Sequence, residues 1–199
     1  RKTVEKIHVS ERKRNVAVHT VGVPSHTNKV SQGGLSIVRG NIPVKSIDAN
    51  YLIAGRWWYM KINKFGETTY PEMLISLAQG LQQGAQGVIV DLRGNTGGYM
   101  GSAIQMVNEF LPKGDMIVYT EGEHTPRYEE RANGRGNCQQ MPIVVLTDET
   151  SASASEIVSG AIQDWDRGTI VGRRTFGKGL VQRPIDLPDG SMIRLTIAR

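Results

Sequence analysis

The sequence predicts an α/β domain with a largely parallel sheet that ends in an antiparallel hairpin. Between residues 69 and 171, short apolar runs alternate with stretches whose apolar residues have helical spacing. Near the end, two strand-like runs flank Pro188-Asp189-Gly190, which is a turn signal between paired strands. The composition, 39% hydrophobic and 22% charged over 199 residues, is typical of a folded chain and excludes a disordered one.

The first elements of this pattern are a strand pair and a helix. Residues 51–53 and 58–62 are predicted to pair around a turn. Thr69-Tyr70-Pro71-Glu72 fits a capping box, in which Glu72 reaches back to the N-cap Thr69. The helix that follows can end at Gly84.

The alternation continues to the end of the chain. Residues 88–90 form a short apolar run without alternation, which predicts a strand buried on both faces. Residues 120–140 are polar and are predicted to form a long loop. The other expected elements are helices near 103–110 and 153–165, strands at 116–119, 143–146 and 169–171, and a hairpin of 180–187 with 192–198.

The charge of the chain is uneven. The net charge is +5, and the first 14 residues hold six basic and two acidic groups. The surplus therefore lies mainly in one segment, without interleaved basic and aromatic residues, so no nucleic-acid partner is expected. We interpret residues 1–45 as a polar leader and residues 46–199 as the folded core.

Several kinds of site are not expected. Cys138 is the only cysteine, so the chain has no internal disulfide and no thiolate metal cluster. The four histidines lack ligand spacing, so neither a metal nor a cofactor is expected. No run approaches the ~20 apolar residues that a membrane-spanning helix needs.

Three serines alternate with alanines between a predicted strand and a predicted helix, at residues 151–155. Backbone N–H groups at a helix start stabilise developing negative charge, which suits a nucleophilic serine. The alternative is that these serines only cap the helix, and the serines alone favour that alternative.

A nucleophilic serine needs a base, and no histidine is near this segment in sequence. Lys178 is the other candidate, although an amine acts as a base only where burial lowers its pKa from about 10.4. No carboxylate lies within five residues of Lys178, which suits a desolvated amine. In an extended chain Gln182 points the same way and could orient it. The alternative is an exposed lysine in a glycine-rich loop.

A glycine-rich turn, Asp91 to Gly98, follows one predicted strand and precedes a helix. This context suits phosphate binding, but the spacing of the known phosphate loops is absent. A glycine pair that faces a catalytic pocket fits better, with Asp91 and Arg93 as structural ion-pair partners.

In combination, these segments resemble the C-terminal processing peptidases, also called tail-specific proteases, which are serine endopeptidases with a Ser–Lys dyad. The resemblance runs from about Trp58 to Arg199. It rests on four motifs in order: YMKI at 59–62 with Phe65, DLRGNTGG at 91–98, SASASEI at 151–157 and GKGLVQ at 177–182.

The resemblance implies a crotonase/ClpP-like protease core that cleaves polypeptides near their C-termini through an acyl-enzyme intermediate. By the family's pattern, Ser153 is the nucleophile, Lys178 is the base and Gln182 supports the lysine. The amides of Ala154 and of one glycine of the 97–98 pair, Gly98, would form the oxyanion hole.

The resemblance also implies features outside the dyad. Family members usually carry a PDZ domain before the core, so residues 1–45 would be the C-terminal remnant of one, and the core would be truncated after Arg199. The expected partners are polypeptides with accessible C-termini, with a homo-oligomer or an adaptor protein as further candidates. The expected location is extracytoplasmic, in the bacterial periplasm or cell envelope.

The alternative function is a catalytically silent domain of the same fold that binds a peptide or another ligand, similar to retinoid-binding repeats. Such a domain is not expected to retain Ser153, Lys178 and Gln182 together. Their presence favours the enzyme.

Overall fold

The computed structural model describes residues 44–199 in full and, before them, only the backbone of four short strands. The chain divides into two compact units, residues 1–45 and 46–199. In the first unit, β1 (Glu5–Lys6) pairs antiparallel with β2 (His19–Thr20), and β3 (Lys29–Gln32) pairs antiparallel with β4 (Leu35–Val38). These strands do not test the expectation of a PDZ remnant, which stays a prediction.

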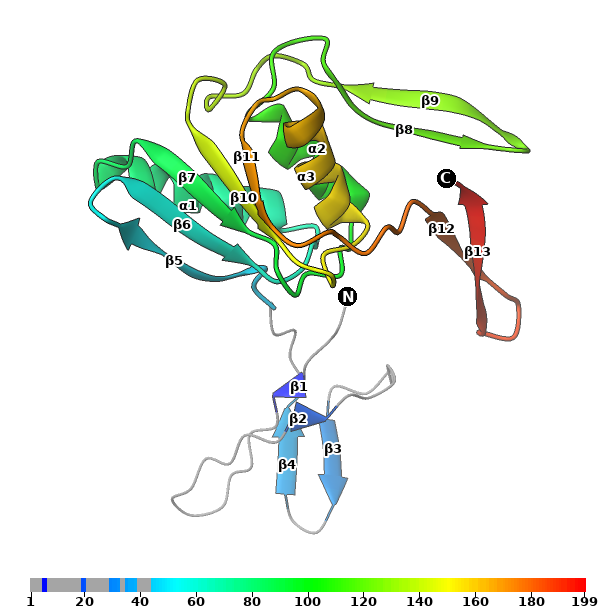
Figure 1. The fold of residues 1–199 in the computed structure, drawn as a ribbon. Helices are drawn as coiled ribbons and strands as arrows, with labels where there is room; N and C mark the ends of the chain where they lie inside the picture. Colours follow the sequence, from blue (N-terminus) through cyan, green and yellow to red (C-terminus); the bar gives the residue numbers. More distant parts are fainter. Residues whose placement is uncertain (1–4, 7–18, 21–28, 33–34, 39–43) are drawn as a thin grey trace. The chain divides into compact units, whose positions relative to one another are not determined.

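The second unit is built on a five-stranded sheet with the order β11-β10-β7-β6-β5 (Figure 1). Only β5 is antiparallel to its neighbour, so the prediction of a largely parallel sheet is confirmed. The strands are β5 (Ile47–Ile53), β6 (Trp57–Ile62), β7 (Gly87–Asp91), β10 (Ile143–Thr147) and β11 (Thr169–Gly172).

Three helices, α1 (Thr69–Gln82), α2 (Met100–Asn108) and α3 (Ala154–Asp164), connect successive parallel strands. Because these strands are neighbours in chain order and such crossovers are right-handed, the helices lie on one face of the sheet. Val88 and Val90 point to that face and are fully buried, whereas Ile89 between them is only half-buried. Gly87 and Asp91, on the same face of the strand as Ile89, are buried, so the prediction of a strand buried on both faces holds except at Ile89.

The core between the sheet and α1 depends on close packing around Trp58. The indole N–H of Trp58 donates to Ser76 Oγ at 2.9 Å, which satisfies the one polar atom of a buried ring. Gly80 leaves room for this ring, because a Cβ at that position would lie 2.5 Å from Trp58 Cγ. Helix α1 is fixed against β6 by this contact.

The start of α1 differs from the predicted capping box. Thr69 is the first helical residue, and its hydroxyl accepts from the Gly66 amide at 2.7 Å. The Glu72 carboxylate does not bond Thr69 but accepts from the amides of Ser46 and Ile47, at 2.8 and 3.1 Å. Glu72 thus joins the helix to the start of β5, a partner that a local motif cannot show.

Two antiparallel hairpins complete the unit, and one of them was not expected. β8 (Met116–Gly122) extends the strand predicted at 116–119, and it pairs with β9 (Thr125–Arg131), which lies within the segment predicted to be a loop. Every second residue on one face of β9 is charged, and these residues form ion pairs: Arg127, Glu129 and Arg131. The alternation that is typical of a strand is therefore formed here by charged residues and not by apolar ones. The second hairpin, β12 (Val181–Asp186) with β13 (Met192–Ala198), agrees with the prediction.

Candidate active site

Gly98 and Ser153, two of the predicted site residues, lie in turns that follow neighbouring strands. Residues 92–99 follow β7 and residues 148–153 follow β10, and these two strands pair in parallel. Their carboxyl ends therefore meet at one edge of the sheet, which is where α/β proteins commonly bind ligands. The turns are joined directly: the Leu92 amide donates to Leu146 O at 2.9 Å, and the Ala152 amide donates to Asn95 O at 3.1 Å.

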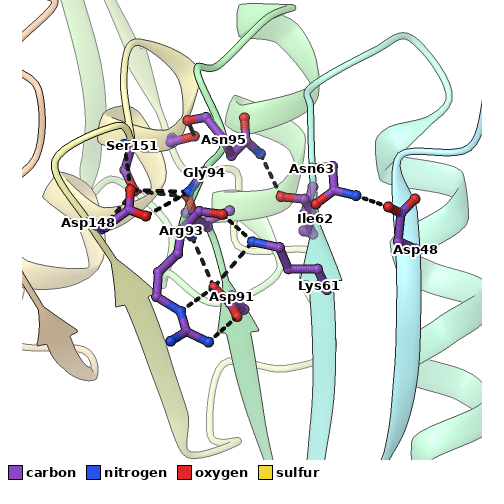
Figure 2. A network of polar contacts seen from close by, with 12 residues as sticks. Asp48, Lys61, Ile62, Asn63, Asp91, Arg93, Gly94, Asn95, Asp148 and Ser151 are labelled. Carbon is purple, nitrogen blue, oxygen red and sulfur yellow. Dashed lines mark hydrogen bonds and ion pairs between the residues drawn. The ribbon is translucent and has the colours of Figure 1, made fainter.

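Asp148 fastens the two turns through its side chain (Figure 2). Its carboxylate oxygens accept from the Gly94 amide at 3.0 and 3.1 Å and from the Thr150 hydroxyl at 2.7 Å. Burial raises the pKa of Asp148, but these hydrogen bonds outweigh it and lower the pKa to about 2. Asp148 is therefore ionised at neutral pH and holds the glycine turn against the end of β10.

Asp91, the last residue of β7, is the centre of a second cluster (Figure 2). It is buried, accepts from Arg93 Nη2 at 2.7 Å and lies 3.4 Å from Lys61 Nζ. It also accepts from Tyr59 Oη at 2.7 Å. Burial raises the pKa of Asp91, but hydrogen bonds from Arg93 and Tyr59 lower it to about 2. Burial and the bond to Asp91 raise the pKa of Tyr59 to about 12. The predicted ion pair of Asp91 with Arg93 is confirmed.

The three alternating serines have different surroundings. Ser151 and Ser155 are fully buried, and their hydroxyls donate to Leu92 O and Asn95 O, each at 2.9 Å. Ser153 is partly exposed and has the left-handed backbone of φ 57° and ψ −114° at the start of α3. A non-glycine residue rarely adopts such a conformation, and strain of this kind gathers at functional sites. The outer serines therefore act as structural links, and the middle one is presented to solvent.

Glu156, in the first turn of α3, joins the Ser153 turn to the Lys178 loop. Its carboxylate accepts from the Ser153 amide at 2.7 Å, from the Gly177 amide at 2.6 Å and from the Lys178 amide at 2.8 Å. Burial raises the pKa of Glu156, and the bonds from Lys178 and Ser153 more than offset it, so the pKa is lowered. An anion at this helix start is also favoured by the helix dipole.

The glycines of the turn lie directly against the Ser153 segment. A Cβ on Gly97 would lie 2.5 Å from Ala152 O and 2.8 Å from Ser153 Cβ. Gly98 forms a parallel bridge with Phe65, and a Cβ on it would lie 2.0 Å from Phe65 O. Both glycines have positive φ, 94° and 142°, so only glycine fits either position without strain.

A cleft of about 760 Å³ brings together four of the five residues that the sequence predicted; the fifth, Ala154, is buried at the start of α3 and is not among the lining residues. Ser153, Lys178, Gln182 and Gly98 all line it, together with the half-buried apolar side chains of Val118 and Ile157. Lys178 is half-buried and Gln182 is exposed. Within the described part of the chain, no direct hydrogen bond joins Lys178 to either Ser153 or Gln182. The cleft thus places a hydroxyl and an amine beside apolar side chains.

Two residues of the site were missed by sequence reasoning. In the sequence, Glu156 is only a member of the SASASEI motif, and no carboxylate lies close to Lys178 along the chain. The fold nevertheless brings the Glu156 carboxylate to the backbone amide of Lys178. Asn95 is fully buried at the joint of the two turns and carried no local signal beyond its place in a glycine-rich turn.

Two findings concern other kinds of site. Across residues 44–199, the structure shows no group of three His, Cys, Asp or Glu side chains that could hold a metal ion. None of the described helices is long and apolar enough to cross a membrane.

Comparison with known proteins agrees with this geometry. A carboxyl-terminal-processing protease of Synechocystis sp. is 41% identical over 141 residues, which cover 71% of this chain and 33% of that protein. A "Probable CtpA-like serine protease" of Staphylococcus epidermidis is 35% identical over 163 residues, 81% of this chain and 33% of that protein. The solved structure of a photosystem II D1 C-terminal processing protease matches with a TM-score of 0.69 and 29% identity, over 83% of this chain and 46% of that one.

The chain thus spans about a third of the length of these curated relatives. The model of peptidase family S41 matches residues 56–199, which include the glycine-rich turn, the Ser153 segment and the Lys178 loop. The chain belongs to peptidase family S41.

Proposed function

We propose that residues 46–199 carry the catalytic groups of a serine endopeptidase that cleaves polypeptides near their C-termini, with Ser153 as nucleophile and Lys178 as base. The observation that carries the proposal is the shared cleft. Ser153, Lys178, Gln182 and Gly98 come from three separate segments and line one cavity. The names of the similar proteases support the choice of substrate.

In the proposed reaction, Ser153 Oγ forms a bond to a peptide carbonyl carbon, and neutral Lys178 takes the proton of the Ser153 hydroxyl. The carbonyl oxygen becomes an oxyanion, stabilised by the amides of Gly98 and Ala154. The C–N bond then breaks, and the leaving amine takes the proton from Lys178. Water then attacks the acyl carbon while Lys178 takes its proton. The bond to Ser153 Oγ breaks, Lys178 returns the proton to that oxygen, and the new carboxyl end is released.

Two features of the structure support these roles. The Gly97 amide donates to Asn95 Oδ1 and the Tyr99 amide donates to Phe65 O, at 2.8 Å each. The Gly98 amide between them has no partner among the described residues, so it is available to an oxyanion. Gln182 lines the same cleft as Lys178 and is proposed to orient its amine.

The wider setting is also a proposal. The resemblance to tail-specific proteases supports an extracytoplasmic location, in the periplasm or cell envelope, and substrates with accessible C-termini. It also supports a PDZ domain as the neighbour of the core and leaves a homo-oligomer or an adaptor as candidate partners.

The proposal is tested on the full-length protein with an unstructured polypeptide as substrate. Ser153→Ala and Lys178→Ala are each expected to abolish cleavage, with Glu129→Gln on the exposed face of β9 as a control that cleaves like the wild type. Substantial turnover by either dyad variant would refute the dyad, and a wild type that only binds the polypeptide would favour the silent-domain alternative.

A further inference from the structure

Asn95 is fully buried, and it forms hydrogen bonds to the end of β6, to the glycine-rich turn and to the turn that contains Ser153. Its Nδ2 donates to the carbonyl of Ile62, the last residue of β6, at 2.8 Å (Figure 2). Its Oδ1 accepts from the Gly97 amide, also at 2.8 Å. The side chain therefore fixes the glycine turn to the end of the neighbouring strand.

The main chain of Asn95 makes a second connection, to the nucleophile turn. Its carbonyl oxygen accepts from the Ala152 amide at 3.1 Å and from the Ser155 hydroxyl at 2.9 Å. These two donors stand on either side of Ser153 in the sequence. One residue thus joins β6, the glycine turn and the turn that presents Ser153.

The position of the Gly98 amide follows from these bonds. The amide before it is held by Asn95, and the Phe65 backbone bonds to Gly97 O at 3.0 Å and to the Tyr99 amide at 2.8 Å. The same turn packs against Ser153, because a Cβ on Gly97 would lie 2.9 Å from the Ala154 amide nitrogen. With Asn95 removed, the Gly97 amide would lose its acceptor and the turn would lose its link to β6.

We infer that Asn95 is the positioning residue of the oxyanion hole: it sets the distance between the Gly98 amide and the Ser153–Ala154 segment. This inference rests on the proposed function, since it concerns the same nucleophile. Oxyanion donors act mainly in the transition state, so the loss of Asn95 should lower kcat and leave KM nearly unchanged. Because the loss of one such donor costs ~10²–10³-fold, we expect kcat to fall by about 10²-fold.

The test uses Asn95→Ala and the milder Asn95→Ser in the full-length protein, with Ser76→Ala as matched control. Ser76 is also a buried polar residue, and it accepts from Trp58 Nε1 at 2.9 Å and from Asn50 Nδ2 at 3.0 Å, within the α1 side of the core. Its variant should lose stability in thermal unfolding but keep kcat. This separates positioning from a general loss of folding energy.

Three quantities are measured for each variant: kcat, KM and the inhibition constant of a peptide boronic acid, whose tetrahedral adduct with serine places an oxygen in the oxyanion hole. In both Asn95 variants, we expect the affinity for the boronic acid to fall by the same factor as kcat/KM. We do not expect it to change in proportion to KM. An unchanged kcat, a rise in KM alone, or a boronate affinity that stays at the wild-type level would overturn the inference. Ser153→Ala, measured in parallel, tests the proposed function separately, because an inactive Ser153→Ala with an active Asn95→Ala leaves the function standing and removes only the role of Asn95.

Discussion

Asp91→Asn offers a quantitative test of how the glycine-rich turn is held. The substitution keeps the size of the side chain and one acceptor oxygen but removes the charge that faces Lys61 and Arg93. The pKa of Asp91 is lowered from 3.8 to about 2. Each unit corresponds to about 1.4 kcal/mol, so ionised Asp91 contributes roughly 2–3 kcal/mol to folding. Arg93 is 53% exposed, and solvent screening reduces the expected loss to about 2 kcal/mol.

The sign of the pH dependence follows from the same numbers. The pKa of Asp91 is lower in the folded state, so its stabilisation is complete above about pH 5 and is lost as the pH falls. About half of it should be gone by pH 3, because the unfolded chain takes up the proton first. Asp91→Asn should therefore be less stable than the wild type at pH 7 and nearly equal to it close to pH 2.

The assay is urea unfolding followed by tryptophan fluorescence, at pH 7, 4 and 3, with the free energy of unfolding compared between variants at each pH. Asp164→Asn is the matched control, because it removes the same charge from an exposed residue of α3 for which the structure shows no ion pair. A gap between Asp91→Asn and wild type below 0.5 kcal/mol at pH 7, or one that stays constant down to pH 3, would refute this account of the cluster.

Two substitutions test the contacts around Ser153. Gly97→Ala should abolish cleavage, because its Cβ would meet the Ser153 turn, whereas Gly84→Ala, with a similar φ of 85° but no atom within 4 Å, should lose only about 1 kcal/mol of stability and still cleave. Equal activities of the two variants would contradict the close approach. Glu156→Gln should lower kcat by about 10²-fold, because the side-chain amide of Gln cannot accept from all three backbone donors. Glu129→Gln is the control for this variant. If Glu156→Gln keeps the wild-type kcat, a positioning role for Glu156 is excluded.

The fold was largely predictable, because its elements carry local signals. Apolar residues at helical spacing and short apolar runs identified the helices and the parallel strands, and Pro188-Asp189-Gly190 identified the last hairpin. The strand predicted at 116–119 agrees with β8, but the prediction was wrong for β9. Arg127, Glu129 and Arg131 alternate along β9, and a strand whose alternating residues are charged resembles a polar loop when only apolar residues are counted.

The sequence by itself determined the family of this chain and the segments of its site, because the DLRGNTGG, SASASEI and GKGLVQ motifs are contiguous and local. It proposed Ser153 and Lys178 for the dyad, and the structure brings both to one cleft. Only the tertiary structure decided how the segments are held together. Glu156 meets the Lys178 amide, and Asn95 meets the Ala152 amide, across gaps of 22 and 57 residues. Such partners are set by which strands lie side by side, and no spacing along the chain encodes that.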